Sequence, residues 1–145
     1  MSSYLMKSVL ALVCLTLVSM PLSAQKGHGG GGGGSTTGSG CAIVDTPMLS
    51  TFTASAGINV GVFDRIGNCS SGKQRYTVTV SAMSSCGQDT VIASNLISFN
   101  GGESKLISIA FPIAPDTCLG ATTVSVSVYA GGTLLGSQPT TLTIQ

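Results

Sequence analysis

Charge is scarce in this chain, and what charge there is balances. Charged residues make up 8% of the sequence, and the formal net charge is +1. A surface that binds nucleic acid or an anionic membrane needs clustered basic side chains. We therefore expect no nucleic-acid partner. Beyond residue 24 the basic residues are Lys26, Arg65, Lys73, Arg75 and Lys105, and the acidic residues are Asp45, Asp64, Asp89, Glu103 and Asp116.

Side chains that carry out catalysis are equally few. The chain has no tryptophan and one histidine, His28, which lies in a run of glycines. A serine or cysteine nucleophile needs a base held beside it, and a glycine run cannot hold one in place. The carboxylates stand next to expected turns, where they usually cap the turn or contact water. The sequence therefore predicts a protein that is not an enzyme and has no cofactor.

Metal-ligating residues do not cluster either. No two cysteines have the C-x-x-C spacing of a zinc site, and no histidine lies near them. Asp64 and Asn68 supply only two oxygen donors, which is fewer than a calcium site requires. We expect no metal site.

The first 24 residues have the pattern of a secretory signal peptide. A single basic residue, Lys7, precedes an apolar run at residues 9–18 and the small-residue ending Leu22-Ser23-Ala24. The run is shorter than the roughly twenty residues that span a bilayer, so we expect no membrane insertion after cleavage. The predicted location is secreted, either extracellular or periplasmic.

Residues 25–40 are predicted to form a flexible linker. Glycine fills residues 27–34, interrupted only by His28, so the segment has almost no side chains to bury. Glycine also loses the most backbone entropy on ordering, which favours a flexible chain. The remaining residues, 41–145, are long enough for one compact domain.

Alternating valines give the clearest structural pattern in that domain. Val124, Val126 and Val128 alternate with hydroxyl side chains in residues 122–130, which is typical of a half-buried strand. An Asn100-Gly101 pair predicts a hairpin. Similar patterns predict six more strands, at residues 48–54, 58–64, 75–83, 90–99, 105–111 and 133–144, with breaks near Ser94-Asn95 and at Pro139.

Seven short strands without a helical segment predict an all-β fold, a Greek-key sandwich. In this architecture residues 41–145 resemble the immunoglobulin-like and fibronectin type III-like sandwiches of exported bacterial proteins. The chain lacks the core tryptophan and the inter-sheet disulfide of antibody domains, and Tyr129 stands at the end of its strand, where it cannot form a tyrosine corner. The resemblance therefore implies the architecture and no particular family.

Four cysteines remain after the predicted cleavage, and an even number in an exported domain predicts two disulfides. In an up-and-down order of strands, Cys41 and Cys69 lie at one end of the sandwich and Cys86 and Cys118 at the other. Crossed pairs would have to span the long axis, far beyond the roughly 7 Å limit between Cα atoms. We predict the bonds Cys41–Cys69 and Cys86–Cys118.

Two functions fit these observations. The first is a structural or interaction module that contacts a protein at the cell surface, with a second copy of itself as one candidate partner. Residues 76–83 and 122–130 lack the lysines that usually protect a strand edge, which would permit strand addition.

The alternative function is a module that binds an extracellular ligand or glycan through loops at residues 65–75 and 100–103. Loops on a rigid sandwich are the usual place for recognition. The candidate contacts are Arg65, Lys73 and Arg75.

Overall fold

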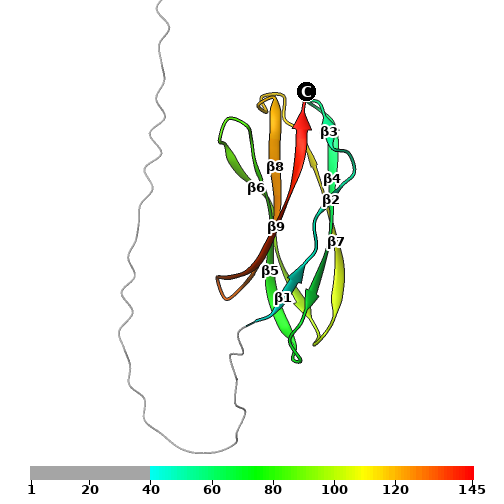
Figure 1. Cartoon of the computed structure of the whole chain (residues 1–145), viewed down its shortest axis with the longest axis vertical. Coiled ribbons are helices and arrows are strands. Elements are labelled where there is room, and N and C mark those ends of the chain that lie inside the picture. The colour runs from blue at the N-terminus through cyan, green and yellow to red at the C-terminus, as the bar shows by residue number, and fades with distance from the viewer. Residues whose placement is uncertain (1–39) are drawn as a thin grey trace, which may run out of the picture. The chain divides into compact units, whose positions relative to one another are not determined.

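The computed structural model describes residues 40–145, which fold as an all-β domain (Figure 1). The predicted signal peptide, and the predicted linker up to residue 39, lie outside the described residues. In residues 40–145 no helix is long and apolar enough to cross a membrane. The strands are β1 (Ala42–Val44), β2 (Met48–Leu49), β3 (Thr53–Ala54), β4 (Asn59–Asn68), β5 (Gln74–Met83), β6 (Asp89–Phe99), β7 (Ser104–Pro112), β8 (Gly120–Ala130) and β9 (Thr133–Ile144).

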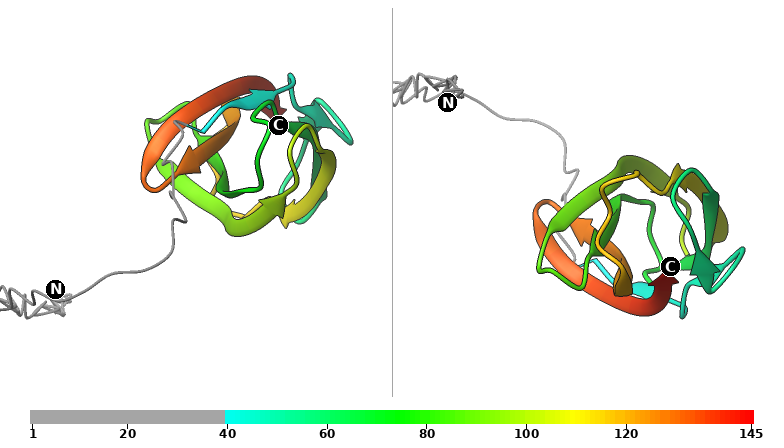
Figure 2. Two further views of the ribbon diagram at one scale, coloured as in Figure 1. Left: turned by 90° about the horizontal axis from the view of Figure 1, so that it is seen from below. Right: turned by 90° about the horizontal axis from the view of Figure 1, so that it is seen from above.

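The strands form two sheets that enclose the core, as the views along the long axis show (Figure 2). The four-stranded sheet is built around β4, which pairs with β7 on one side and with β1 and β2 on the other. The five-stranded sheet has the order β3-β9-β8-β5-β6, and β3 runs parallel to β9. As a result, β6 is the edge of one sheet and β7 is the edge of the other.

The core follows from the alternation seen in the sequence. Val124, Val126 and Val128 are 0% exposed, and β8 lies between β5 and β9 in the centre of its sheet. Because successive side chains of a strand point to opposite faces, the hydroxyls between these valines lie on the outer face. The predicted strand at residues 122–130 is confirmed. The other fully buried apolar side chains include Val60, Val62, Ile66, Tyr76, Val78, Val80, Phe99 and Leu142.

The predicted count of seven strands is wrong, because the structure has nine. The segment expected as one strand at residues 48–54 is divided between the two sheets, with β2 paired to β4 and β3 paired to β9. Between them Thr51 turns the chain and donates a hydrogen bond to the carbonyl of Thr53 at 2.7 Å. Strands of two or three residues are too short to show a period. The expected Greek-key connectivity stays a prediction.

The strand predicted at residues 58–64 is also longer than expected. It begins at Asn59 and continues past Asp64 to Asn68, so Arg65 stands on a strand and not in a loop. Ile66 is 0% exposed and Asn68 is 2% exposed, so the alternation continues through this segment. Polar residues at inward positions made the segment look like a loop.

Two predicted interruptions are absent from the structure. β6 runs without a break through Ser94-Asn95, and its irregularity lies at Ile92, where the register against β5 shifts. β9 runs through Pro139, which pairs with Ser125 of β8. Only the last two residues of β9 pair with β3, so the proline stands where the other side of β9 is an edge, a position that tolerates a missing N–H.

The turn at Asn100-Gly101 is present, but it does not make a hairpin. It connects β6 to β7, which belong to different sheets. A Cβ on Gly101 would clash with the carbonyl oxygen of Ser71, and the positive φ of 71° falls on Gly102. Gly101 is therefore needed for close approach to the neighbouring loop.

The two disulfides pair as predicted. Cys41 and Cys69 are bonded with their Cα atoms 5.1 Å apart, and Cys86 and Cys118 with theirs 6.2 Å apart. The first bond joins the start of β1 to the end of β4, and the second joins the β5–β6 turn to the β7–β8 loop. One disulfide therefore lies at each end of the domain.

At the Cys41–Cys69 end, one buried amide links three segments. The Nδ2 of Asn68 donates to the carbonyls of Gly72 and Asn100 at 2.9 and 2.8 Å. Its Oδ1 accepts from the N–H of Ser70 at 2.9 Å and lies 2.8 Å from the hydroxyl of Tyr76, whose one proton is shared with the carbonyl of Cys41, also at 2.8 Å. All the hydrogen-bonding capacity of the side chain is thus used by protein groups.

Replacing Asn68 should be among the most destabilising single changes at this end. Asn68→Ala leaves several buried donors and acceptors unpaired and should lower the free energy of unfolding by about 3 kcal/mol. Tyr76→Phe removes one hydroxyl and should cost about 1 kcal/mol. Urea denaturation with the disulfides intact measures both. Equal losses for the two variants would contradict the central role of the amide.

Candidate functional site

The cationic residues predicted as contacts do not form one cluster. Arg65, Lys73 and Arg75 are all exposed. Arg65 stands on β4 of the four-stranded sheet and Arg75 on β5 of the five-stranded sheet, and both alternate with buried neighbours. The two arginines therefore point outward from opposite sheets, and Lys73 lies in the loop between them. Their role in binding stays a prediction.

The loop that follows β4 and the turn between β6 and β7 pack tightly on each other. The N–H of Gly102 donates to the carbonyl of Ser70 at 3.1 Å, and that of Asn68 donates to the carbonyl of Glu103 at 2.8 Å. Glu103 also lies 3.7 Å from the ammonium of Lys105. The Cys41–Cys69 end is therefore closed by its own hydrogen bonds.

The open side of the sandwich lies between β6 and β7. These two edges face each other from different sheets without pairing. We call the groove between β6 and β7 the seam, and two hollows lie along it. The middle hollow has a volume of about 220 Å³ and is lined by Val78, Asn95, Ile97, Ile107 and Ile109, among others. The terminal hollow, of about 320 Å³, lies at the Cys86–Cys118 end.

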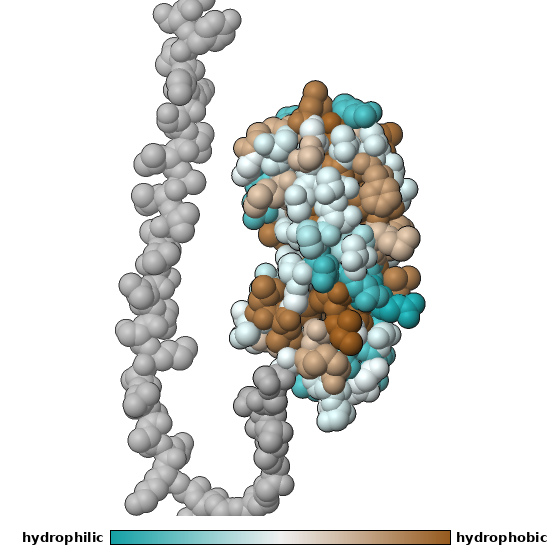
Figure 3. Space-filling model, viewed as in Figure 1, coloured by the Kyte–Doolittle hydropathy of each residue, from teal (hydrophilic) through white to brown (hydrophobic). Residues whose placement is uncertain are grey.

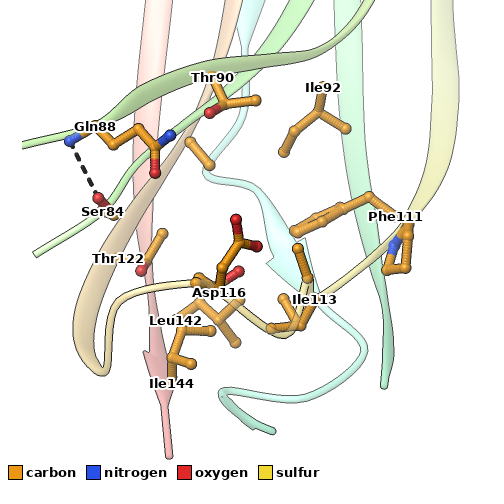
Figure 4. Close-up of a pocket in the computed structure, with 14 residues that line it drawn as sticks. Ser84, Gln88, Thr90, Ile92, Phe111, Ile113, Asp116, Thr122, Leu142 and Ile144 are labelled. Carbon is orange, nitrogen blue, oxygen red and sulfur yellow. Dashed lines mark hydrogen bonds between the residues drawn. The ribbon is translucent and has the colours of Figure 1, made fainter. Parts of the chain in front are cut away.

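The terminal hollow is lined by both apolar and polar side chains (Figure 4). Phe111, Ile113 and Leu142 supply apolar surface from β7, the loop after it and β9. Figure 4 shows the carboxylate of Asp116 pointing into the space between Thr122 and Phe111. Six of the fourteen lining residues are polar, so the hollow offers hydrogen-bonding groups beside its apolar surface.

The edge strand of the five-stranded sheet beside the seam is β6. The sequence had instead predicted strand addition at residues 76–83 and 122–130. The uncharged segments 76–83 and 122–130 lie within β5 and β8, which are interior strands of the five-stranded sheet. β6 has eleven residues with neither lysine nor proline, and its only charged residue is Asp89, at its start. Val91 and Leu96 on this strand are 63% and 59% exposed. A long edge strand without lysine or proline is a template for strand addition.

The outer face of the five-stranded sheet is rich in hydroxyls. Thr79 and Ser94 lie 3.2 Å apart across β5 and β6, and Ser127 and Ser137 lie 2.8 Å apart across β8 and β9. The space-filling view of one face of the domain shows only small strongly hydrophilic areas (Figure 3). The hydroxyls on this face thus satisfy part of their hydrogen bonding among themselves.

Asp64 is buried, although the sequence predicted it beside a turn or in contact with water. It is 2% exposed and faces the core between Val62 and Ile66 on β4. Neither carboxylate oxygen has a hydrogen-bond partner. Burial raises the pKa of Asp64 to about 7, the nearby N–H of Arg65 lowers it in part, and the negative charge of Asp45 raises it further.

The buried acid does not belong to either hollow. Neither Asp64 nor Asp45 lines the seam cavities. Within residues 40–145, no three metal-ligating side chains gather into one group. Asp64 therefore bears on stability and offers no catalytic pair in a cavity.

Comparison with known proteins gives the fold and no family. No protein-family model and no curated protein matches the chain. Among solved structures, the chain is similar to Spo0M, a sporulation control protein from Bacillus subtilis, with a TM-score of 0.55 and 15% identity over 73% of this chain and 50% of that one. The CARDB domain of a Pyrococcus furiosus protein, solved with two metal ions, has a TM-score of 0.53 and 12% identity.

The coverage of these matches differs widely. The alignment takes in 70% of this chain and 90% of the CARDB domain. A β-glucosidase from Erythrobacter marinus matches with a TM-score of 0.61 and 10% identity, over 73% of this chain and only 16% of the enzyme. These similarities show a shared all-β architecture, because identities this low carry no information about activity.

The stability of the domain should fall as pH rises through the range in which Asp64 ionises. The pKa is about 7 in the folded protein against an ordinary value of 3.8, so the folded state holds the proton more tightly. The free energy of unfolding should therefore decrease between about pH 4 and pH 7, by at most about 4 kcal/mol. Urea denaturation at several pH values measures this slope.

The matched variant for this prediction is Asp64→Asn, which resembles the protonated acid. It should remove the slope and be more stable than the native chain above pH 7. Asp89→Asn changes an exposed acid on β6 and serves as the control for a lost charge. A native slope that persists in Asp64→Asn would show that another group is responsible.

Proposed function

We propose that this protein is an exported, non-enzymatic interaction module of the immunoglobulin-like or fibronectin type III-like class, and that it binds an extended protein segment along the seam. The observation that carries the proposal is an edge strand, β6, that has no charged residue after Asp89 and lies beside a groove with apolar walls. The backbone of β6 can pair with an added strand, and this mode of recognition obtains affinity from main-chain hydrogen bonds.

The side chains of an added strand would find apolar surroundings in the seam. Ile92 and Ile97 of β6, and Ile109 and Phe111 of β7, are only partly buried although they pack against the core. Alternate residues of an added strand point to one face, so every second side chain would enter the groove. The partner segment is therefore expected to alternate apolar and polar residues.

A second copy of the chain is one candidate partner. Two β6 edges can pair in an antiparallel manner about a twofold axis, which is the commonest symmetry of protein dimers. Sedimentation of the exported protein over a range of concentrations distinguishes a dimer from a monomer that needs a different partner. A photo-crosslinker at Leu96 then identifies the segment that contacts β6 in the producing cell.

The loop-based alternative remains a second proposal with a weaker basis. Arg65 and Arg75 stand on the outer faces of different sheets, so a glycan would have to reach around the end of the domain to contact both. Joint replacement of Arg65, Lys73 and Arg75 by alanine tests it. If the seam is the binding site, this triple variant should retain association.

A single lysine in the seam should weaken association. Asn95 is exposed, stands opposite the core residue Val78 in the β5–β6 register and lines the middle hollow. In Asn95→Lys an inward-pointing charge at the edge should weaken strand addition at least about tenfold, while changing the free energy of unfolding by no more than about 0.5 kcal/mol. Sedimentation and crosslinking from Leu96 measure the association.

The matched control is Thr123→Lys, which places the same charge on the hydroxyl-rich outer face of β8. Thr123 is also exposed, and it stands opposite Met83 and Thr141 on neighbouring strands. This variant should associate like the native chain. Loss of association in Thr123→Lys together with normal association in Asn95→Lys would place the interface on the outer face and overturn the proposal.

A further inference from the structure

The terminal hollow carries a negative charge that no basic residue balances. Asp116 lines the hollow, and no lysine or arginine is among its lining residues. The one ion pair in residues 40–145 joins Glu103 to Lys105, near the other end of the domain. Asp116 itself is exposed, and its carboxylate forms no ion pair within the described part of the chain. It is therefore free to meet a cationic group that enters the hollow.

A second polar group in the hollow lacks a partner. Thr122 is 5% exposed and lines the cavity, and its Oγ1 makes no hydrogen bond. A buried hydroxyl without a partner destabilises the fold, and such groups are rare in native proteins. Thr122 and Asp116 both line this hollow (Figure 4), so a group bound in it lies near both side chains.

The Cys86–Cys118 disulfide holds the two sides of the hollow together. It connects the β5–β6 turn, which carries Gln88, to the loop that carries Asp116. The hydroxyl of Ser85 donates to the carbonyl of Leu119 at 2.7 Å, which adds a second link between the same segments. Fixing both walls before a ligand arrives reduces the entropy that binding would cost.

We propose that the terminal hollow binds a primary ammonium group on an apolar stem. The ammonium donates to the Asp116 carboxylate and to the Thr122 hydroxyl, while the stem lies against Ile92, Phe111 and Leu142. A charge-assisted bond of this kind is stronger than a neutral one. The hollow, at about 320 Å³, is at the lower end of small-ligand sites, so a stem of about six carbons suits it.

Two sources present this chemistry, a free alkylamine and the side chain of a lysine in a peptide. Binding is followed by amide chemical shifts of the labelled protein, purified after export, during titration with n-hexylamine, 1-hexanol or hexanoate at one salt concentration. A glycine-flanked lysine peptide and its glutamine counterpart form the second arm. Hexylamine should bind at least about tenfold more tightly than hexanol, and hexanoate should bind least.

Three variants separate the ammonium contact from nonspecific effects. Asp116→Asn should reduce the affinity for hexylamine about tenfold and leave that for hexanol unchanged. Glu103→Gln removes a carboxylate outside the hollow and should leave the affinities for hexylamine and hexanol unchanged. Thr122→Val should weaken hexylamine binding severalfold and raise the melting temperature of the free protein by a few degrees, because the unpaired hydroxyl is gone.

The outcomes are distinct. Shifts centred on residues of the hollow, with loss of hexylamine affinity in Asp116→Asn, support the site, and the peptide arm shows whether a lysine side chain also fits. Equal affinity for hexylamine and hexanol, or an undiminished affinity in Asp116→Asn, overturns it. Asn95→Lys should leave amine binding intact because Asn95 lines the other hollow, so the site and the strand-addition function can fail independently.

Discussion

The structure depends on how the edge strands of its two sheets are treated, because an edge strand has backbone N–H and C=O groups that no neighbouring strand pairs. On one side of the sandwich β1, β2 and β3 are divided between the two sheets and pair with β4 and β9. On the other side β6 and β7 are not paired with each other, and the seam between them remains open. The same valine-rich core therefore has one closed side and one side that offers unpaired backbone groups and partly buried isoleucines.

The two ends of the domain are fixed in different ways, although each has one disulfide. At the Cys41–Cys69 end, the Asn68 side chain uses its full hydrogen-bonding capacity on neighbouring backbone and on Tyr76. At the Cys86–Cys118 end, the bond joins two loops around a cavity that keeps unpaired polar groups. The first arrangement fills the space between its loops, and the second leaves a cavity between them.

Much of the fold could be predicted from the sequence, because alternating valines mark strands wherever one face is buried. The disulfide pairs also followed, since they require only the order of the strands. The continuation of β4 could not be predicted, because Asp64 and Asn68 occupy inward positions that are usually apolar. The seam was missed for another reason. Ile92 and Phe111 come from strands of different sheets, and the Asn100-Gly101 pair suggested that these strands were neighbours in one hairpin.

Three buried polar side chains show how their surroundings decide their role. Asn68 is fully paired, so it contributes to stability. Asp64 is unpaired and enclosed by the core away from both hollows, so its burial can be relieved only by protonation, and stability becomes dependent on pH. Thr122 is also unpaired, but it borders a cavity that contains the Asp116 carboxylate. A hydroxyl has no charge to lose near neutral pH, so only a hydrogen-bonding group that enters the cavity can satisfy it. The same kind of unpaired burial therefore predicts a stability effect at one position and a binding site at the other.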